Sequence, residues 1–168
     1  MKRLVYLTLL VIFAFSLSAC AKATSQPTDE TIKPGDKIGD FLITTGDEGE
    51  VTYTWDLGCV KKGEGETYFC EVAIGTKVNV SFGIYDDTLS GKLEDLWASH
   101  TYELFIENRH VNLQAFGFID VIHPRVGKMR HWNVIIFTDK PGEITCYHSG
   151  VADGDPFEST MAYIFSAP

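Results

Sequence analysis

One stretch of the sequence most strongly limits what this chain can fold into. It is residues 130–148 (RHWNVIIFTDKPGEITCYH), in which a Pro-Gly turn separates two apolar runs. Residues 132–137 are almost wholly apolar, which is typical of an interior strand covered on both faces. Residues 139–142 (DKPG) supply turn chemistry. The run beyond the turn alternates, so one face of a second strand carries Ile144, Cys146 and His148. The pattern predicts the central hairpin of an all-β domain.

Further short alternating runs extend this interpretation along the chain. In the clearest, residues 77–85 (KVNVSFGIY), alternation places Val78 and Val80 inward and Asn79 and Ser81 outward. The other expected strands are residues 41–44, 51–56, 67–72, 101–107, 118–122 and 160–165. Acidic, glycine-rich turns separate them. Roughly eight short strands predict an immunoglobulin-like antiparallel β-sandwich, formed as a single domain by residues 32–168.

One segment departs from strand periodicity and several aromatic residues need a place. In residues 90–99, Leu93, Leu96 and Trp97 have helical spacing, which predicts a short helical turn at one end of the sandwich. We expect Trp132 in the core beside its apolar neighbours. The stretch 115–118 (AFGF) suits either a buried bulge or an exposed patch for a partner, and the buried bulge is favoured.

The first nineteen residues have the features of a secretory signal. A short basic segment precedes an apolar run that is too short to cross a bilayer as a helix. Its ending, residues 17–20 (LSAC), resembles the lipobox of bacterial lipoproteins, in which the cysteine becomes the lipidated N-terminus. The resemblance implies lipid attachment at Cys20. The alternative is an ordinary signal whose cleavage releases a secreted protein.

Lipidation at Cys20 implies a location in the cell envelope. Acyl chains on Cys20 would hold the protein at the extracytoplasmic side of a membrane. Because Ala21 follows the cysteine, the resemblance implies the outer membrane where the bacterium has two membranes. Residues 20–31 then form the lipidated end and a flexible tether, in which residues 21–31 have a reach of ~18 Å.

The charge of the mature chain excludes one class of partner. The whole sequence has a formal charge of −9, and loss of residues 1–19 leaves 12 basic residues against 23 acidic ones, or −11. A surface this acidic repels phosphate backbones. We therefore expect no nucleic-acid partner, and we leave open a protein or glycan ligand.

Cysteine usage also fits an oxidising compartment. Cys59 and Cys70 bracket a segment with Gly63 and Gly65 near its centre, which would turn the chain back and bring the two cysteines together. A disulfide is expected there. Cys146 is then most simply a buried free thiol, although its pairing with either of the others stays open at this stage.

Residues 141–148 (PGEITCYH) also carry a second resemblance. A Pro-Gly turn leading to a cysteine, a histidine and a downstream Met161 resembles the copper end of cupredoxins. The resemblance implies a blue-copper site with His100 or His123 as a further ligand. The sequence departs from the family because one residue alone separates Cys146 from His148. The interpretation without a metal, a core cysteine beside a histidine, is preferred.

Other chemistry has weaker support. Asp153, Asp155 and Glu158 could offer oxygen ligands to Ca²⁺, but a solvated acidic loop is the preferred interpretation. Motifs for nucleophilic, zinc-dependent or phosphate chemistry are absent from the sequence. We therefore predict a non-catalytic, lipid-anchored binding or structural module without a cofactor. A copper electron carrier is the first alternative, and a small secreted hydrolase ranks lowest.

Overall fold

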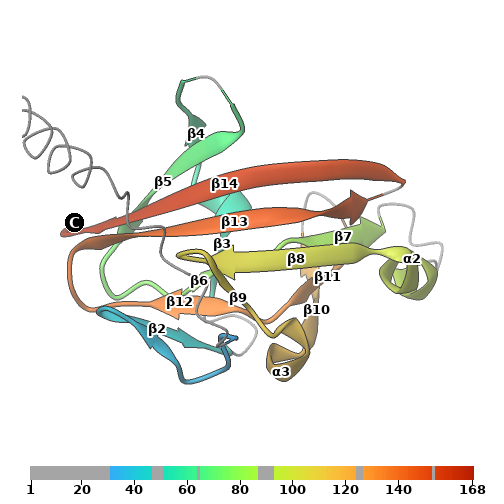
Figure 1. Cartoon of the computed structure of the whole chain (residues 1–168), viewed down its shortest axis with the longest axis horizontal. Helices are drawn as coiled ribbons and strands as arrows, with labels where there is room; N and C mark the ends of the chain where they lie inside the picture. The colour runs from blue at the N-terminus through green and yellow to red at the C-terminus, as the bar shows by residue number, and fades with distance from the viewer. Residues whose placement is uncertain (1–30, 47–50, 64, 87–92, 124–126, 153) are drawn as a thin grey trace, which may run out of the picture.

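The computed structural model describes residues 31–46, 51–63, 65–86, 93–123, 127–152 and 154–168 (Figure 1). Cys20 and the rest of the predicted signal and tether up to residue 30 lie outside these residues. Strands dominate the described part. Its helices are short, and none of them is both long and apolar enough to cross a membrane.

The largest sheet forms one layer of the fold. Its six strands follow the order β4 (Val60–Lys61), β5 (Thr67–Ala73), β14 (Asp155–Ser166), β13 (Gly142–Ala152), β8 (Thr101–Ile106) and β9 (Arg109–His110). The long pair β13 and β14 runs through its centre (Figure 1). Within this sheet all pairings are antiparallel except that of β14 with β5, which run parallel.

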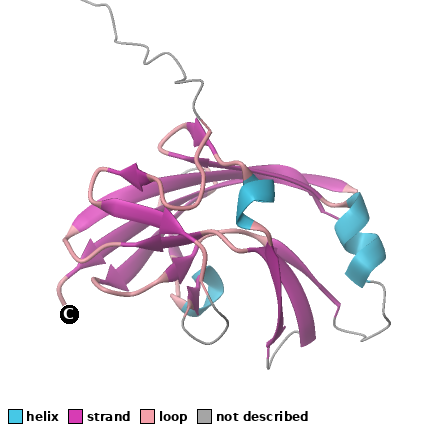
Figure 2. Cartoon of the chain, turned by 90° about the horizontal axis from the view of Figure 1, so that it is seen from below, coloured by secondary structure: helices cyan, strands magenta, loops and turns pink. Residues whose placement is uncertain are grey.

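Two smaller sheets complete the architecture. The five-stranded sheet has the order β1 (Lys37–Ile38), β2 (Phe41–Thr44), β12 (Ile135–Phe137), β6 (Val78–Asn79) and β3 (Thr52–Tyr53). The three-stranded sheet has the order β10 (Phe118–His123), β11 (Gly127–Trp132) and β7 (Gly83–Asp86). In Figure 2 the three-stranded sheet projects away from the layered part of the fold.

Three helical segments lie between strands. They are the 3-10 turn η1 (Thr54–Asp56), α2 (Leu93–Ser99) and α3 (Leu113–Phe116). The predicted helical turn within residues 90–99 is therefore present as α2. Leu93 is buried while Glu94 and Asp95 face solvent, as the helical spacing requires.

The hydrophobic core lies between the two larger sheets. Buried side chains of the six-stranded sheet include Leu104, Ile106, Ile144, Cys146, Tyr163 and Phe165. The five-stranded sheet contributes Phe41, Ile43, Val78 and Ile136. Apolar residues recur at alternate positions of these strands, which is why one face of each sheet is buried. The predicted all-β sandwich is confirmed, although two strand pairs, β14 with β5 and β3 with β6, run parallel and not antiparallel as predicted.

The predicted central hairpin is wrong. The expected strand at residues 132–137 is divided, because β11 ends at Trp132 and β12 begins at Ile135 in a different sheet. Strand β12 pairs with β2 and β6, whereas β13 pairs with β14 and β8. The Pro-Gly turn therefore carries the chain from one layer to the other instead of closing a hairpin.

The expected strand at residues 77–85 is also divided. It forms β6 and β7, and Gly83 lets β7 approach β11, since a Cβ there would lie 2.0 Å from the Arg130 carbonyl oxygen. Asn79 and Ser81, predicted to face outward, are each 1% exposed. Their burial is possible because their polar atoms are hydrogen-bonded inside the fold.

The aromatic assignments need correction as well. Trp132, predicted to lie in the core, packs against the core but is only half-buried, because it also lines a surface hollow. In the stretch 115–118, Phe116 is buried at the end of α3, whereas Phe118 is 49% exposed on β10. Neither the buried bulge nor a wholly exposed patch describes this stretch.

Candidate functional site

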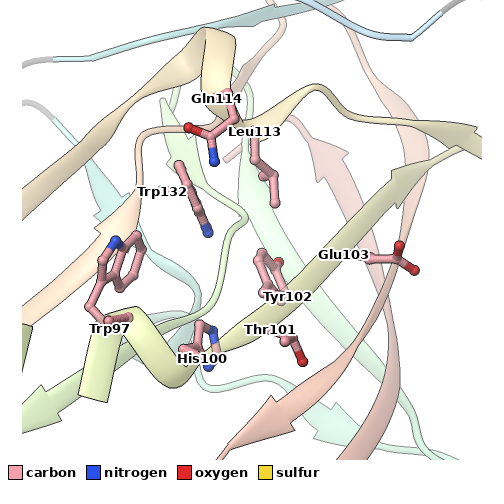
Figure 3. A pocket seen from close by; sticks show the side chains of 9 residues that line it. Trp97, His100, Thr101, Tyr102, Glu103, Leu113, Gln114 and Trp132 are labelled. Carbon is pink, nitrogen blue, oxygen red and sulfur yellow. The ribbon is translucent and has the colours of Figure 1, made fainter. Parts of the chain in front are cut away.

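A hollow of ≈ 500 Å³ opens where four elements meet: the end of α2, the start of β8, α3 and the end of β11. Its lining residues are Trp97, Ala98, His100, Thr101, Tyr102, Glu103, Leu113, Gln114 and Trp132 (Figure 3). The volume lies within the range of small-ligand and side-chain pockets.

Aromatic rings form the walls of the hollow. The centroids of Trp97 and Trp132 are 4.9 Å apart, and His100 stacks with Tyr102 at 5.9 Å. In Figure 3 the indole nitrogen of Trp132 points toward the space between Trp97 and Tyr102. This nitrogen is buried and has no hydrogen-bond partner. The hollow therefore offers apolar walls and one N–H that lacks an acceptor.

The polar side chains at the rim do not make the hollow charged. The Gln114 side chain is exposed and points inward, so its amide can bind a ligand group. Glu103 lies on the opposite face of β8 from Tyr102 and points away from the hollow (Figure 3). The geometry fits a neutral, mainly apolar group that carries a hydrogen-bond acceptor.

Hydrogen bonds below the hollow hold Tyr102 in place. The backbone N–H of Phe82 donates to the Tyr102 hydroxyl oxygen at 3.1 Å. The hydroxyl lies 2.8 Å from Nδ1 of His148. A hydroxyl can accept two hydrogen bonds and donate one, so it satisfies both the Phe82 N–H and His148 Nδ1. The hollow therefore has a rigid floor.

His148 is a neutral part of this floor. It is fully buried and stacks on Phe82 with ring centroids 4.2 Å apart. Burial disfavours the charged imidazolium and lowers the pKa of His148 to about 3. At neutral pH it is an uncharged hydrogen-bond partner of Tyr102 and cannot act as a cation.

An arginine joins the hollow to the outer face of the β10–β11 pair. The Arg130 guanidinium lies 4.5 Å from the Phe118 ring centroid and 5.9 Å from that of Trp97. Two hydrogen bonds of 2.6 and 2.8 Å tie it to Asp120. These bonds lower the pKa of Asp120 and raise that of Arg130, so both groups stay charged. Trp97 in turn contacts Phe118 at 5.6 Å.

A second buried histidine lies on the other face of β11. His131 is fully buried and stacks on Tyr53 and Trp55 at 4.8 and 5.0 Å. Neither of its ring nitrogens has a hydrogen-bond partner. Burial lowers the pKa of His131 to about 4. Its position in a closed aromatic stack gives it a structural role.

The three cysteines of the described part are in two states. Cys59 and Cys70 form a disulfide with Cα atoms 4.3 Å apart. Cys146 is free and fully buried, and burial raises the pKa of its thiol. A thiol in this environment is shielded and protonated.

The described residues of the copper alternative lie on β13, on β14 and at the hollow. Cys146 and His148 share the inner face of β13, and Met161 lies opposite Cys146 on the neighbouring strand β14. Within the described ranges, no three His, Cys, Asp or Glu residues group as metal ligands. His100 instead lines the hollow, and the His123 side chain is not among those described. The geometry gives the copper alternative no support.

The predicted calcium loop is described in part. Asp155 and Glu158 lie in β14, which continues the β13–β14 ladder, while Asp153 lies outside the described residues. The preferred interpretation of this loop, solvated acidic residues, stays a prediction.

The sequence does not predict the hollow, although it predicts Trp97 in a helical turn and Trp132 in the core. Gln114 was not singled out. The signal that could have been used is the short spacing of Trp97, His100 and Tyr102, which puts three rings at one helix-to-strand junction.

Comparisons with known proteins do not assign this chain to a family. The sequence matches no family model and no curated protein. Among solved structures it is similar to the cysteine protease inhibitor EhICP2 from Entamoeba histolytica, with 7% identity and a TM-score of 0.32 over 70% of this chain and 94% of that chain. It is also similar to PbICP-C, solved in complex with falcipain-2, with 13% identity and a TM-score of 0.30 over 71% of this chain and 100% of that chain. At TM-scores this low, neither similarity carries an argument about what this chain binds.

Proposed function

We propose that this chain is a non-catalytic binding module, lipid-anchored in the cell envelope, that recognises another protein through the aromatic hollow. The observation that carries the proposal is the Trp132 indole N–H, which is buried without an acceptor at the wall of a ≈ 500 Å³ hollow. A buried donor without a partner costs free energy. Rotation of the half-buried indole as a partner binds would let an acceptor on that partner supply the missing hydrogen bond.

The composition of the site favours a protein partner. Tryptophan, tyrosine and arginine are the residue types that contribute most to binding at protein interfaces. The hollow and its surroundings contain all three types, as Trp97, Trp132, Tyr102 and Arg130. Tyr102 and Arg130 are held by hydrogen bonds to His148 and Asp120, so little side-chain entropy is lost when a partner binds.

Two reactive side chains beneath the hollow are unavailable for catalysis. His148 and Cys146 are both fully buried. Burial keeps the imidazole neutral and the thiol protonated near pH 7. Neither group can exchange protons with a molecule bound in the hollow.

The lipid anchor rests on the sequence. Residues 17–20 resemble a lipobox, and residues 21–31 have the composition of a tether. Under this proposal acyl chains on Cys20 supply membrane attachment, and the folded domain is left free to bind its partner.

Site-specific photo-crosslinking in the native envelope tests the binding proposal. The crosslinking amino acid p-benzoylphenylalanine replaces Gln114 at the rim, and Glu143, exposed at the start of β13, is the control position. We expect a protease-sensitive adduct from position 114 that is absent from position 143. The adduct should disappear when Trp97→Ala is added to a chain whose circular dichroism shows it folded. Equal adducts at both positions, or none at 114, would reject the hollow as a binding site.

The anchor is tested separately. Cys20→Ser should release the protein from membranes and remove the mass of the acyl chains. An unchanged mass and membrane fraction in this variant would reject lipidation and leave the binding proposal untouched.

A further inference from the structure

Strand β10 has one free edge in the part of the chain that the structure describes. It pairs with β11 on one side, and no strand lies on its other side. The N–H of Asn133 donates to the carbonyl of Gly117 at 2.9 Å, so these two opposite residues form a hydrogen-bonded pair. Along β10 and β11, hydrogen-bonded pairs then alternate with pairs that are not hydrogen-bonded. In an antiparallel pair, Phe118, Asp120 and Ile122 therefore direct their backbone N–H and C=O groups away from β11.

The same three residues expose their side chains on one face. Phe118 is 49% exposed and Ile122 is 84% exposed. Natural proteins usually protect an edge with proline, lysine or a bulge, and the sequence of β10 (FIDVIH) contains neither proline nor lysine. An apolar edge with free backbone groups can accept another strand.

Asp120 at the centre of the edge stays charged, because its carboxylate is bound by Arg130 at 2.6 Å and lies 3.5 Å from the Lys128 ammonium group. This charge disfavours a second copy of this chain as the occupant. A two-fold antiparallel pairing over the whole edge would place Asp120 opposite Asp120, and each mature copy has a formal charge of −11.

We infer that the free edge of β10 binds an extended segment of a partner protein by strand addition. The segment carries apolar residues opposite Phe118 and Ile122 and a basic residue opposite Asp120. Its basic residue complements an acidic molecule. Because the Phe118 ring contacts Trp97 at 5.6 Å, one end of the segment reaches the hollow. The inference rests on the proposed function and names the kind of partner.

The chain supplies its own probe. Strand β11 (GKMRHW) pairs with the other side of β10, with Trp132 opposite Phe118, Arg130 opposite Asp120 and Lys128 opposite Ile122. A capped synthetic peptide of this sequence, with isoleucine in place of the lysine, presents apolar residues to Phe118 and Ile122 and the arginine to Asp120. Its matched control carries glutamate in place of the arginine.

Amide hydrogen exchange followed by NMR detects strand addition directly. In the mature domain alone, the amides of Asp120 and Ile122 should exchange faster than those of Ile119 and Val121, which bond to β11. With the basic peptide at millimolar concentration, we expect exchange at Asp120 and Ile122 to slow by at least about tenfold. The acidic peptide should leave their rates unchanged.

A pair of variants at one position separates backbone pairing from apolar contact. Ile122→Pro removes an N–H that faces the free edge, and an edge strand tolerates proline there. It should abolish the protection of Asp120 by the peptide, whereas Ile122→Thr should keep it. Protection that survives in Ile122→Pro would overturn strand addition.

The other outcomes are also decisive. No protection with either peptide overturns the inference. Peptide-induced shifts at the Trp97 and Trp132 indoles without protection at Asp120 overturn the edge and leave the hollow in place. Protection that grows with protein concentration in the absence of peptide shows that a second copy occupies the edge, which overturns the assigned partner.

Discussion

The hydroxyl of Tyr102 and Nδ1 of His148 are joined by a 2.8 Å hydrogen bond at the floor of the aromatic hollow. The bond links a residue that lines the binding site to a residue that is completely buried in the sandwich. Since the Phe82 N–H also donates to this hydroxyl, one phenolic oxygen satisfies two groups that cannot reach water.

Tyr102→Phe should destabilise the domain by about 1–3 kcal/mol, because it leaves the Phe82 N–H and His148 Nδ1 buried without partners. Urea unfolding at pH 7 measures the loss. Tyr85→Phe, at a tyrosine that is 54% exposed, is the matched control and should change stability by less than about 0.5 kcal/mol. Equal effects would show that the bond contributes nothing.

Asn79→Asp should also be destabilising, in contrast to the near-neutral effect that strand alternation predicts. The Asn79 side chain donates to the Trp132 carbonyl at 3.1 Å and accepts from the Ser81 N–H at 2.9 Å. A carboxylate cannot donate and would be buried, so we expect a loss of about 2–4 kcal/mol in thermal or urea unfolding.

The control for Asn79→Asp is the same chemical change at an exposed amide. Gln114→Glu, at the rim of the hollow, should alter stability by less than about 0.5 kcal/mol. A neutral result for Asn79→Asp would contradict the burial of this residue.

Stability should fall as the solution is acidified below pH 6.5. Burial lowers the pKa of His131 from 6.5 to about 4 and that of His148 to about 3. In this range the unfolded chain binds protons that the folded chain excludes, so stability is full above pH 6.5 and is lost as the pH falls toward 4. For His131 alone the loss between pH 7 and 4.5 is about 2–3 kcal/mol.

His131→Phe tests this assignment because it keeps an aromatic ring between Tyr53 and Trp55 and removes the titrating group. Its free energy of unfolding, measured in urea from pH 7 to pH 4.5, should decline less steeply than that of the wild type. Identical slopes would show that His131 does not cause the pH dependence.

Alkylation should distinguish the cysteines of the folded domain. Cys146 is fully buried, so it should resist labelling in the native state and react in denaturant. Cys59 and Cys70 should remain unlabelled in denaturant until a reductant is added. Peptide mass mapping after each step identifies the labelled residue. Labelling of Cys146 in the native protein would contradict its burial, and labelling of Cys59 without reductant would contradict the disulfide.

Local patterns predicted the class of the fold because they record which face of each strand is buried. Strands β5 and β8 and helix α2 lie where alternation or helical spacing placed them. The hairpin at residues 130–148 was wrong because a Pro-Gly turn reverses the chain equally well within one sheet or between two. The sheet that each strand joins depends on distant pairings, such as β12 with β2.

The burial of Asn79 and the presence of the hollow could not be predicted from the sequence, because both depend on contacts between residues that are distant in the chain. The partner of the Asn79 amide is the Trp132 carbonyl, which is remote in sequence. The walls of the hollow likewise come from α2, β8 and β11, which are distant in sequence except at one junction. Only the wall between Trp97 and Tyr102 is formed by residues that are close together in the chain. Alternation assigns a polar residue to solvent unless a distant partner is known.

The parallel pairing of β14 with β5 also sets a limit on the order of folding. Strand β14 follows all other described strands in the chain, yet it lies between β5 and β13 in the middle of the largest sheet. Until residues near Phe165 are available, β5 has no partner at Val72, and the inner face of the sheet is incomplete. The sandwich therefore cannot close until β14 has been synthesised, however early the other strands are made.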